Sequence, residues 1–272
     1  MLGSLTIVSK SLAPYRVNFY REVARALALQ GWRTTLVVAL AGAKDHPWLS
    51  PGESDSILKI IEVRGELSDA RLWIWLKRKL HLPVDTALPT RRLFSELEAS
   101  APDVVWTHEY SPFCLSAATW AFFRDRFTIL STEIGDSPLP YACSKRGLLL
   151  HRIASFLYQA VIAHSKEATR RSHPSGAPVI FAPHAIDTSE YHPQKTKEER
   201  PFRFLFTGSL DDRKGIRRLI EAGRLLADSG KEFEVRVLGS GPLSSWLAEQ
   251  KDPWLNIAGF KEGEALRNEY RN

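Results

Sequence analysis

Short apolar runs alternate along this chain with stretches in which apolar residues recur at helical spacing. The run at 5–8 is followed by a helical pattern that ends near residue 29 and by a second apolar run at 32–40. Further short apolar runs, each predicted to be a strand, lie at 57–63, 102–108, 127–132 and 160–163. Strands that alternate with helices are typical of parallel sheets, so the pattern predicts an α/β fold.

A second strand–helix–strand unit occupies residues 202–242, FRFLFTGSLDDRKGIRRLIEAGRLLADSGKEFEVRVLGSGP. Its first apolar run ends at Gly208, and the polar loop that follows contains Arg213 and Lys214. A right-handed crossover would bring this loop and the start of the next helix to one edge of a sheet. A helix N-terminus with two cations beside it suits a phosphate or diphosphate. The alternative is that both cations are solvated residues beside a turn.

Charged residues also follow the predicted strands in the first half of the chain. His108 and Glu109 end one strand, Glu133 and Asp136 follow the next, and Arg16 comes after the first. In a parallel sheet these residues share one edge, which is where open α/β sheets bind ligands. The alternatives are a purely structural hydrogen-bonding role for His108 and a solvated position for Arg16.

The polar segment TSEYHPQKTKEER at 188–200 separates the two halves. Charged segments with proline are common between domains, and 272 residues are enough for two domains. We therefore predict a first domain at 1–187, a linker at 188–200 and the first part of a second domain at 201–272.

Composition narrows the classes of partner. The net charge of +6 suits a phosphate-bearing substrate, an anionic membrane surface or a nucleic acid. None of the common nucleic-acid-binding patterns occurs, so we expect no nucleic acid partner.

The cysteines, Cys114 and Cys143, lack the spacing of a metal site, and we expect neither a metal nor another cofactor. No apolar run of about 18 residues and no signal peptide are present, which predicts a cytoplasmic protein.

Two segments, at 71–82 and 144–157, mix large apolar residues with lysine or arginine and contain no acid. Basic amphipathic helices of this kind can lie in a membrane interface. One interpretation of this pattern is peripheral attachment to the inner face of the cytoplasmic membrane. The alternative is that both helices pack their apolar faces inside the domain.

The motifs GSLDDRKG, LIEA and VLGSGP resemble the donor domain of family 4 retaining glycosyltransferases. The segments DVVWTH, VIAHSKEATRR and PHAID extend the resemblance over nearly the whole chain. It implies a GT-B fold with two Rossmann-like domains of parallel sheets, the second incomplete here. Members of this family continue for about another hundred residues beyond the point that corresponds to residue 272, which would complete the second domain. That further part carries an E-x7-E motif. We therefore expect this sequence to be a fragment of a longer protein.

The resemblance also implies roles for individual residues. Gly208, Arg213 and Lys214 would bind the donor diphosphate, and Phe260 would lie near the nucleotide base. His108 and Glu133 would be the catalytic candidates that orient the sugar or acceptor, with Glu133 in place of a histidine that is usual in the family. Arg16 and Asp136 would lie on the acceptor side.

The function implied is transfer of a sugar, with retention, from a nucleotide-diphosphate sugar to a glycan or lipid-linked acceptor. For bacterial relatives such acceptors belong to cell-envelope polysaccharide or glycolipid synthesis. The alternative is a non-catalytic sugar- or nucleotide-binding protein on the same fold.

Overall fold

The computed structural model describes residues 2–10, 14–39, 54–63, 89–133, 145–171, 176–185, 188, 191 and 201–271. The chain divides into two compact units, Met1–Ile186 and Asp187–Asn272. The predicted helix at 71–82, the candidate Asp136 and most of the predicted linker lie outside the described residues. The assignment of the two units to the acceptor and donor sides stays a prediction.

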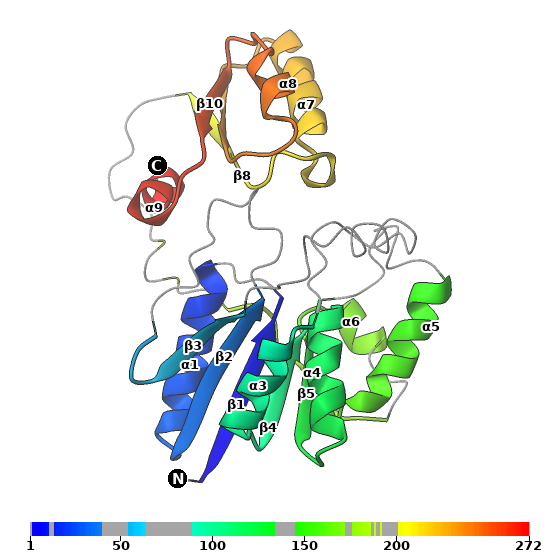
Figure 1. Cartoon of the computed structure of the whole chain (residues 1–272). Helices are drawn as coiled ribbons and strands as arrows, with labels where there is room; N and C mark the ends of the chain where they lie inside the picture. Colours follow the sequence, from blue (N-terminus) through cyan, green and yellow to red (C-terminus); the bar gives the residue numbers. More distant parts are fainter. Residues whose placement is uncertain are drawn as a thin grey trace. The chain divides into compact units, whose positions relative to one another are not determined.

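Unit 1 is built on a seven-stranded sheet in which every neighbouring pair of strands is parallel. In sequence order the strands are β1 (Gly3–Ser9), β2 (Trp32–Ala39), β3 (Leu58–Val63), β4 (Val104–His108), β5 (Phe127–Thr132), β6 (Ala160–Ala163) and β7 (Val179–Phe181). Their order across the sheet is β3-β2-β1-β4-β5-β6-β7 (Figure 1). The direction of winding therefore reverses between β1 and β4, which makes the carboxyl ends of these strands the natural place for a ligand.

Helices cover both faces of this sheet (Figure 1). They are α1 (Pro14–Ala28), α3 (Arg91–Ser100), α4 (Pro112–Phe122), α5 (Lys145–Ala154), the 3-10 turn η2 (Ser155–Leu157) and α6 (Lys166–Arg171). Because successive strand residues point to opposite faces, Ile7 packs beneath α1 while Val8 packs beneath α3 and α4. Burial on both faces explains why the strands are near-continuous apolar runs.

Unit 2 has a smaller parallel sheet of β8 (Phe202–Thr207), β9 (Phe233–Leu238) and β10 (Leu255–Gly259), in the order β10-β9-β8. Its helices are the 3-10 turn η4 (Asp212–Lys214), α7 (Ile216–Asp228), α8 (Ser244–Ala248) and α9 (Gly263–Arg271). Ile216 and Ile220 of α7 pack on Val235 and Val237 of β9, and all four are buried. The predicted α/β class with two parallel sheets is confirmed.

Three local features differ from the pattern. Helix α1 begins at Pro14, whereas the sequence pattern places a loop to residue 15; proline suits a first helical turn because its φ is already helical. The sequence after Pro242 predicts a helix that runs to Gln250, whereas α8 ends at Ala248. Strand β7 has only three residues, too few to show the alternation of apolar and polar positions that indicates a strand, so the sequence pattern does not predict it.

Cys114 anchors the start of α4 beneath the carboxyl ends of two strands. Its Sγ is 3.1 Å from the carbonyl oxygen of His108 and 3.4 Å from that of Val8. Burial raises the pKa of this thiol to about 11. It is therefore an uncharged group that fills the core and donates to the ends of β4 and β1.

The last described helix is tied to the sheet of unit 2 by charge. Arg236 on β9 donates from Nη2 to Glu269 Oε1 on α9 at 2.8 Å, and Lys261 pairs with the same carboxylate. The bond from Arg236 lowers the pKa of Glu269 to about 2.

In the part of the chain that the structure describes, none of the helices is long and apolar enough to cross a bilayer.

Candidate functional site

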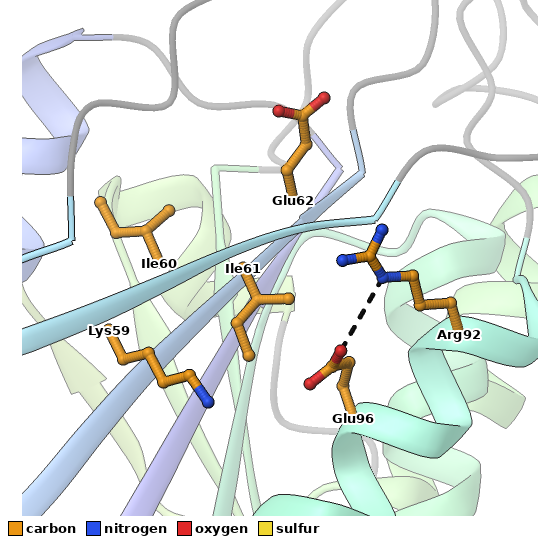
Figure 2. A pocket seen from close by; sticks show the side chains of 6 residues that line it. All are labelled: Lys59, Ile60, Ile61, Glu62, Arg92 and Glu96. Carbon is orange, nitrogen blue, oxygen red and sulfur yellow. Dashed lines mark ion pairs between the residues drawn. The ribbon is translucent and has the colours of Figure 1, made fainter.

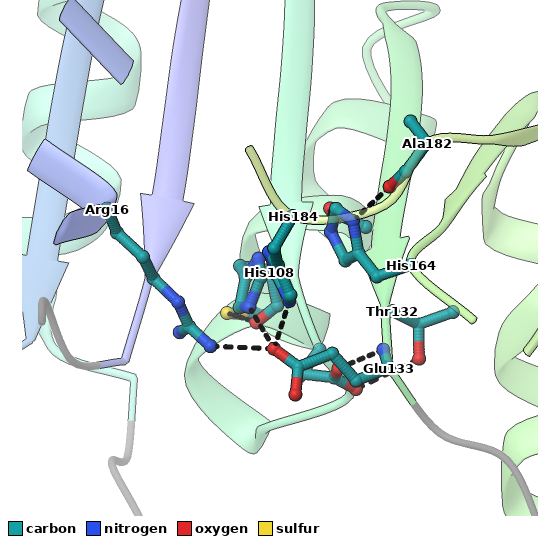
Figure 3. Close-up of polar contacts among 10 residues, drawn as sticks. Arg16, His108, Thr132, Glu133, His164, Ala182 and His184 are labelled. Carbon is teal, nitrogen blue, oxygen red and sulfur yellow. Dashed lines mark hydrogen bonds and ion pairs between the residues drawn. The ribbon is translucent and has the colours of Figure 1, made fainter. Parts of the chain in front are cut away.

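Polar side chains gather at the carboxyl edge of the unit 1 sheet (Figure 3). Arg16 comes from the first turns of α1 and His108 ends β4. The other residues follow successive strands: Glu133 after β5, His164 after β6 and His184 after β7. Because all these strands are parallel, their ends meet at one edge, beside the β1–β4 reversal. The structure thus brings Arg16, His108 and Glu133 together; their roles stay predictions.

Glu133 is the centre of this cluster. Its Oε1 accepts hydrogen bonds from Arg16 Nη2 at 2.9 Å and from His184 Nε2 at 2.7 Å. Burial alone would raise the pKa of Glu133, but Arg16 and His184 outweigh it and lower that pKa below its ordinary value. Glu133 is therefore a carboxylate at neutral pH, held in place from two sides.

His108 is the most enclosed of the ring groups, with a side chain 5% exposed. Its Nε2 is 3.9 Å from Glu133 Oε1 and has no hydrogen-bond partner among the described residues. Burial, together with the nearby charge of Arg16, holds the pKa of His108 well below its usual range. A neutral buried nitrogen without a partner is costly, so a ligand hydroxyl at this position would complete its bonding.

Glu109 supports the backbone of the same cluster. It has a positive φ of 63°, and its carboxylate accepts from Thr132 Oγ1 at 3.0 Å and from the Glu133 N–H. Burial raises the pKa of Glu109 to about 7, which suits a group that gives and takes a proton at neutral pH. Sequence reasoning placed Glu109 at the strand end but gave it no role.

The raised pKa of Glu109 makes the stability of the protein depend on pH. In the unfolded chain this carboxyl ionises near pH 4.5, whereas in the folded chain it keeps its proton to about pH 7. Between these values stability should fall as pH rises, by about 2 kcal/mol for a group that is not fully enclosed. The Glu109→Gln variant should lack this fall.

Urea unfolding at pH 4 and pH 8 measures the effect. The exposed Glu232→Gln variant is the matched control and should follow the wild type. An unchanged pH dependence in Glu109→Gln would contradict the assigned protonation.

Two histidines missed by the sequence reasoning complete the cluster. Because the Ala182 carbonyl can only accept, His164 donates to it from Nδ1 at 2.7 Å, and its Nε2 then accepts from the Ser131 hydroxyl at 2.6 Å. The rings of His164 and His184 stack at 4.1 Å. His164 therefore holds His184 against Glu133. His164 follows a strand that the sequence predicts, so the strand-end rule that found His108 would have found it too. His184 follows β7, which the sequence pattern does not predict.

His108, Glu109 and Glu133 offer ligand atoms that all lie within 4.8 Å of one another. Histidine and glutamate are residue types that bind divalent metal ions, so this set of side chains could hold one. However, the Arg16 guanidinium already pairs with Glu133, so the cluster contains its own positive charge. The expectation of no metal stays a prediction.

A second group of candidates lies at the carboxyl edge of the unit 2 sheet. Gly208 follows β8, Gly239 follows β9 and Phe260 follows β10. A Cβ atom added to Gly239, whose φ is 143°, would be 1.8 Å from the carbonyl oxygen of Gly208. The two loops therefore touch backbone to backbone, and this contact requires a residue without a side chain at 239.

The loop after Gly208 places two cations before a helix. Asp211 Oδ1 accepts from the backbone N–H of Lys214 at 2.9 Å, and Arg213 lies 3.8 Å from the other oxygen of the same carboxylate. The exposed Lys214 passes beside Gly208. Gly215 then caps α7 without a side-chain bond, which leaves the first-turn N–H groups facing the loop. This arrangement suits an anion; the roles of Gly208, Arg213, Lys214 and Phe260 stay predictions.

A separate surface pocket of about 450 Å³ lies along the edge strand β3 (Figure 2). It is lined by Lys59, Ile60, Ile61, Glu62, Arg92 and Glu96. Arg92 and Glu96 form an ion pair of 3.8 Å on α3. None of the candidate residues lines this pocket, and we do not assign the function to it.

No protein-family model and no curated protein sequence matches the chain. Solved structures do match in fold. Anabaena HepE, in complex with UDP and glucose, is 14% identical with a TM-score of 0.63 and is matched over 96% of this chain and 70% of its own. The E. coli trehalose-6-phosphate structure bound with UDP-2-fluoro glucose is 12% identical with a TM-score of 0.63, and the match covers 97% of this chain and 75% of that one. UDP-N-acetylglucosamine 2-epimerase from Rickettsia bellii is 12% identical with a TM-score of 0.57, and the match covers 98% of this chain and 72% of that one. These likenesses show the GT-B fold.

Proposed function

We propose that the protein is a family 4 glycosyltransferase that moves a sugar, with retention, from a nucleotide-diphosphate sugar to a glycan or lipid-linked acceptor of the cell envelope. The GT-B fold and neighbours solved with UDP or a UDP-sugar analogue support a nucleotide-sugar donor. The observation that carries the proposal is the uncapped N-terminus of α7 directly after Arg213 and Lys214. It lies at the sheet edge where Gly208 and Gly239 bring two loops together.

In this mechanism the bond between the anomeric carbon and the diphosphate oxygen breaks, and negative charge builds on the leaving diphosphate. Lys214, Arg213 and the N–H groups of α7 stabilise that charge, so positive side chains perform the task of a metal. The acceptor oxygen forms the new bond on the same face of the sugar. Its proton passes to the leaving phosphate, and no strong base is required.

The unit 1 cluster would orient the sugar or the acceptor. Glu133, ionised and fixed by Arg16, can accept hydrogen bonds from sugar hydroxyls. His108 can complete the bonding of its buried Nε2 with one further hydroxyl. Asp136 belongs to the same proposal as an acceptor-side residue.

Calorimetric titration of the protein with UDP, GDP and ADP, each compared with its monophosphate, tests the donor site. One diphosphate should bind at least about tenfold more tightly than its monophosphate, because the second phosphate adds charge-assisted bonds. EDTA should not change this affinity. If no nucleotide diphosphate binds, the proposal is wrong. Binding without sugar transfer or release would instead favour the non-catalytic alternative.

A second candidate function is epimerisation of a nucleotide sugar. It is favoured by one observation, the pair Glu109 and Glu133, in which a carboxyl with a pKa of about 7 stands beside one whose pKa is lowered below its ordinary value. Epimerases must remove and return a proton at one sugar carbon, and such a pair can do so. Incubation with UDP-N-acetylglucosamine in D2O, without an acceptor, distinguishes the two functions. Deuterium at the inverted carbon would identify an epimerase.

A further inference from the structure

Helix α5 and the turn η2 present a row of large apolar side chains to solvent. Leu149, Ile153 and Phe156 are 58%, 59% and 62% exposed. Their spacing of four and then three residues places them on one face of the helix. In contrast, Ala154, Ser155 and Tyr158 are buried. We call the exposed group the α5 face, defined by Leu149, Arg152, Ile153 and Phe156.

One of the two alternatives for this segment is that the helix packs its apolar face inside the domain. A helix that packed its apolar face inside the domain would bury Ile153 and Phe156, and it does not. The helix is nevertheless held to unit 1 from its other side, where the ring of His151 stacks on Tyr110 at 4.5 Å. Figure 1 shows α5 at the outer margin of unit 1. The α5 face is therefore a fixed surface.

Charge indicates what this surface binds. Arg152 is exposed between Leu149 and Ile153. In the sequence, Lys145 and Arg146 precede these residues. The sequence from residue 137 to residue 166 contains no acid. Exposed apolar rows with basic neighbours suit the headgroup region of an anionic bilayer, where the apolar side chains enter the lipid and the cations contact phosphates.

We propose that the α5 face docks the protein on an anionic lipid surface, with Leu149, Ile153 and Phe156 inserted at the interface and Arg152 among the headgroups. This goes beyond the proposed sugar transfer and does not depend on it. If the transfer proposal is also right, the acceptor would be lipid-linked or made at a membrane.

Sedimentation of the whole chain with vesicles tests the proposal. The protein should bind vesicles of phosphatidylcholine mixed with phosphatidylglycerol, should bind vesicles of phosphatidylcholine alone at least about tenfold less, and should be released by high salt. Arg152→Glu should weaken binding about tenfold, and the triple change Leu149→Ser, Ile153→Ser and Phe156→Ser should weaken it further.

Matched controls come from another surface of unit 1. Leu29→Ser removes a leucine that is 91% exposed, and Arg33→Glu reverses an exposed charge; neither change should alter vesicle binding. Circular dichroism checks that each variant is folded.

Any of the following would overturn the proposal: no binding to anionic vesicles at low salt, equal binding by the folded triple variant and the wild type, or a wild-type dimer that Ile153→Ser converts to a monomer. Vesicle binding abolished only by Lys77→Glu, Arg78→Glu and Lys79→Glu would place attachment in the other basic segment and would also overturn it. Nucleotide binding, measured on the same samples, reports separately on the proposed transferase.

Discussion

Replacing Lys214 by alanine is expected to lower turnover about hundredfold while both sheets stay folded. The reason is that Lys214 is an exposed cation beside Gly208, at the start of a helix whose first N–H groups have no side-chain cap. Loss of one contact to charge that develops in the transition state typically costs about 3 kcal/mol, which is about hundredfold in rate. Steady-state kinetics with the donor found by titration, together with circular dichroism, measures both parts of the expectation.

Two further variants make the Lys214 result specific. Lys231→Ala removes an exposed lysine from the loop before the amino end of β9, whereas Gly239 of the proposed site follows the carboxyl end of that strand. This variant should leave turnover unchanged. Lys214→Arg keeps the charge and should retain more activity than Lys214→Ala. Turnover of Lys214→Ala at the wild-type rate would show that the assigned role is wrong.

Gly239→Ala is expected to destabilise unit 2 by about 4 kcal/mol or more. Two costs add: a side chain at a φ of 143°, and a Cβ atom 1.8 Å from the backbone oxygen of Gly208. That oxygen cannot move freely, because the Gly208 N–H is bonded to Leu238 at 3.1 Å and Leu210 N–H is bonded to Ser240 at 3.0 Å. Urea unfolding followed by far-ultraviolet circular dichroism measures the loss.

Gly230→Ala is the matched control. Gly230 also has a positive φ, 74°, but a Cβ atom there would meet nothing within 4 Å. This variant should cost only the conformational strain, about 1 kcal/mol. Equal destabilisation by both variants would mean that the close approach of the two loops contributes little to stability.

Much of the fold was predictable because its strands are buried on both faces and are therefore continuous apolar runs. Residues 127–132 show this, since the predicted and observed bounds of β5 agree. The bounds of β8 at 202–207 agree as well, because its apolar run is continuous although the strand is only partly buried. Strand β7 escaped prediction because three residues do not establish a pattern. Helix α8 was predicted too long because its continuation past Ala248 has helix-forming residues, and local preference does not reveal where packing ends.

The candidate site was predictable to the extent that parallel strands align their ends. That rule alone placed Arg16, His108 and Glu133 at one edge. It does not reveal how the groups interact: the raised pKa of Glu109 arises from burial against Thr132 and the Glu133 backbone, which is a tertiary effect. His184 was not placed at this edge because it follows β7, a strand that the sequence pattern does not predict.

The reactivity of the buried Cys114 thiol can be used to detect ligand binding at the neighbouring cluster that contains His108 and Glu133. Its Sγ is bonded to the carbonyl of His108, so a reagent can reach it only when α4 separates from the end of β4. In a variant in which Cys143 is replaced, the rate of disulfide exchange at Cys114 would equal the rate of that opening whenever exchange is faster than closing. A ligand that binds across His108 and Glu133 would slow the reaction, and the degree of protection would give its affinity even if no turnover assay existed.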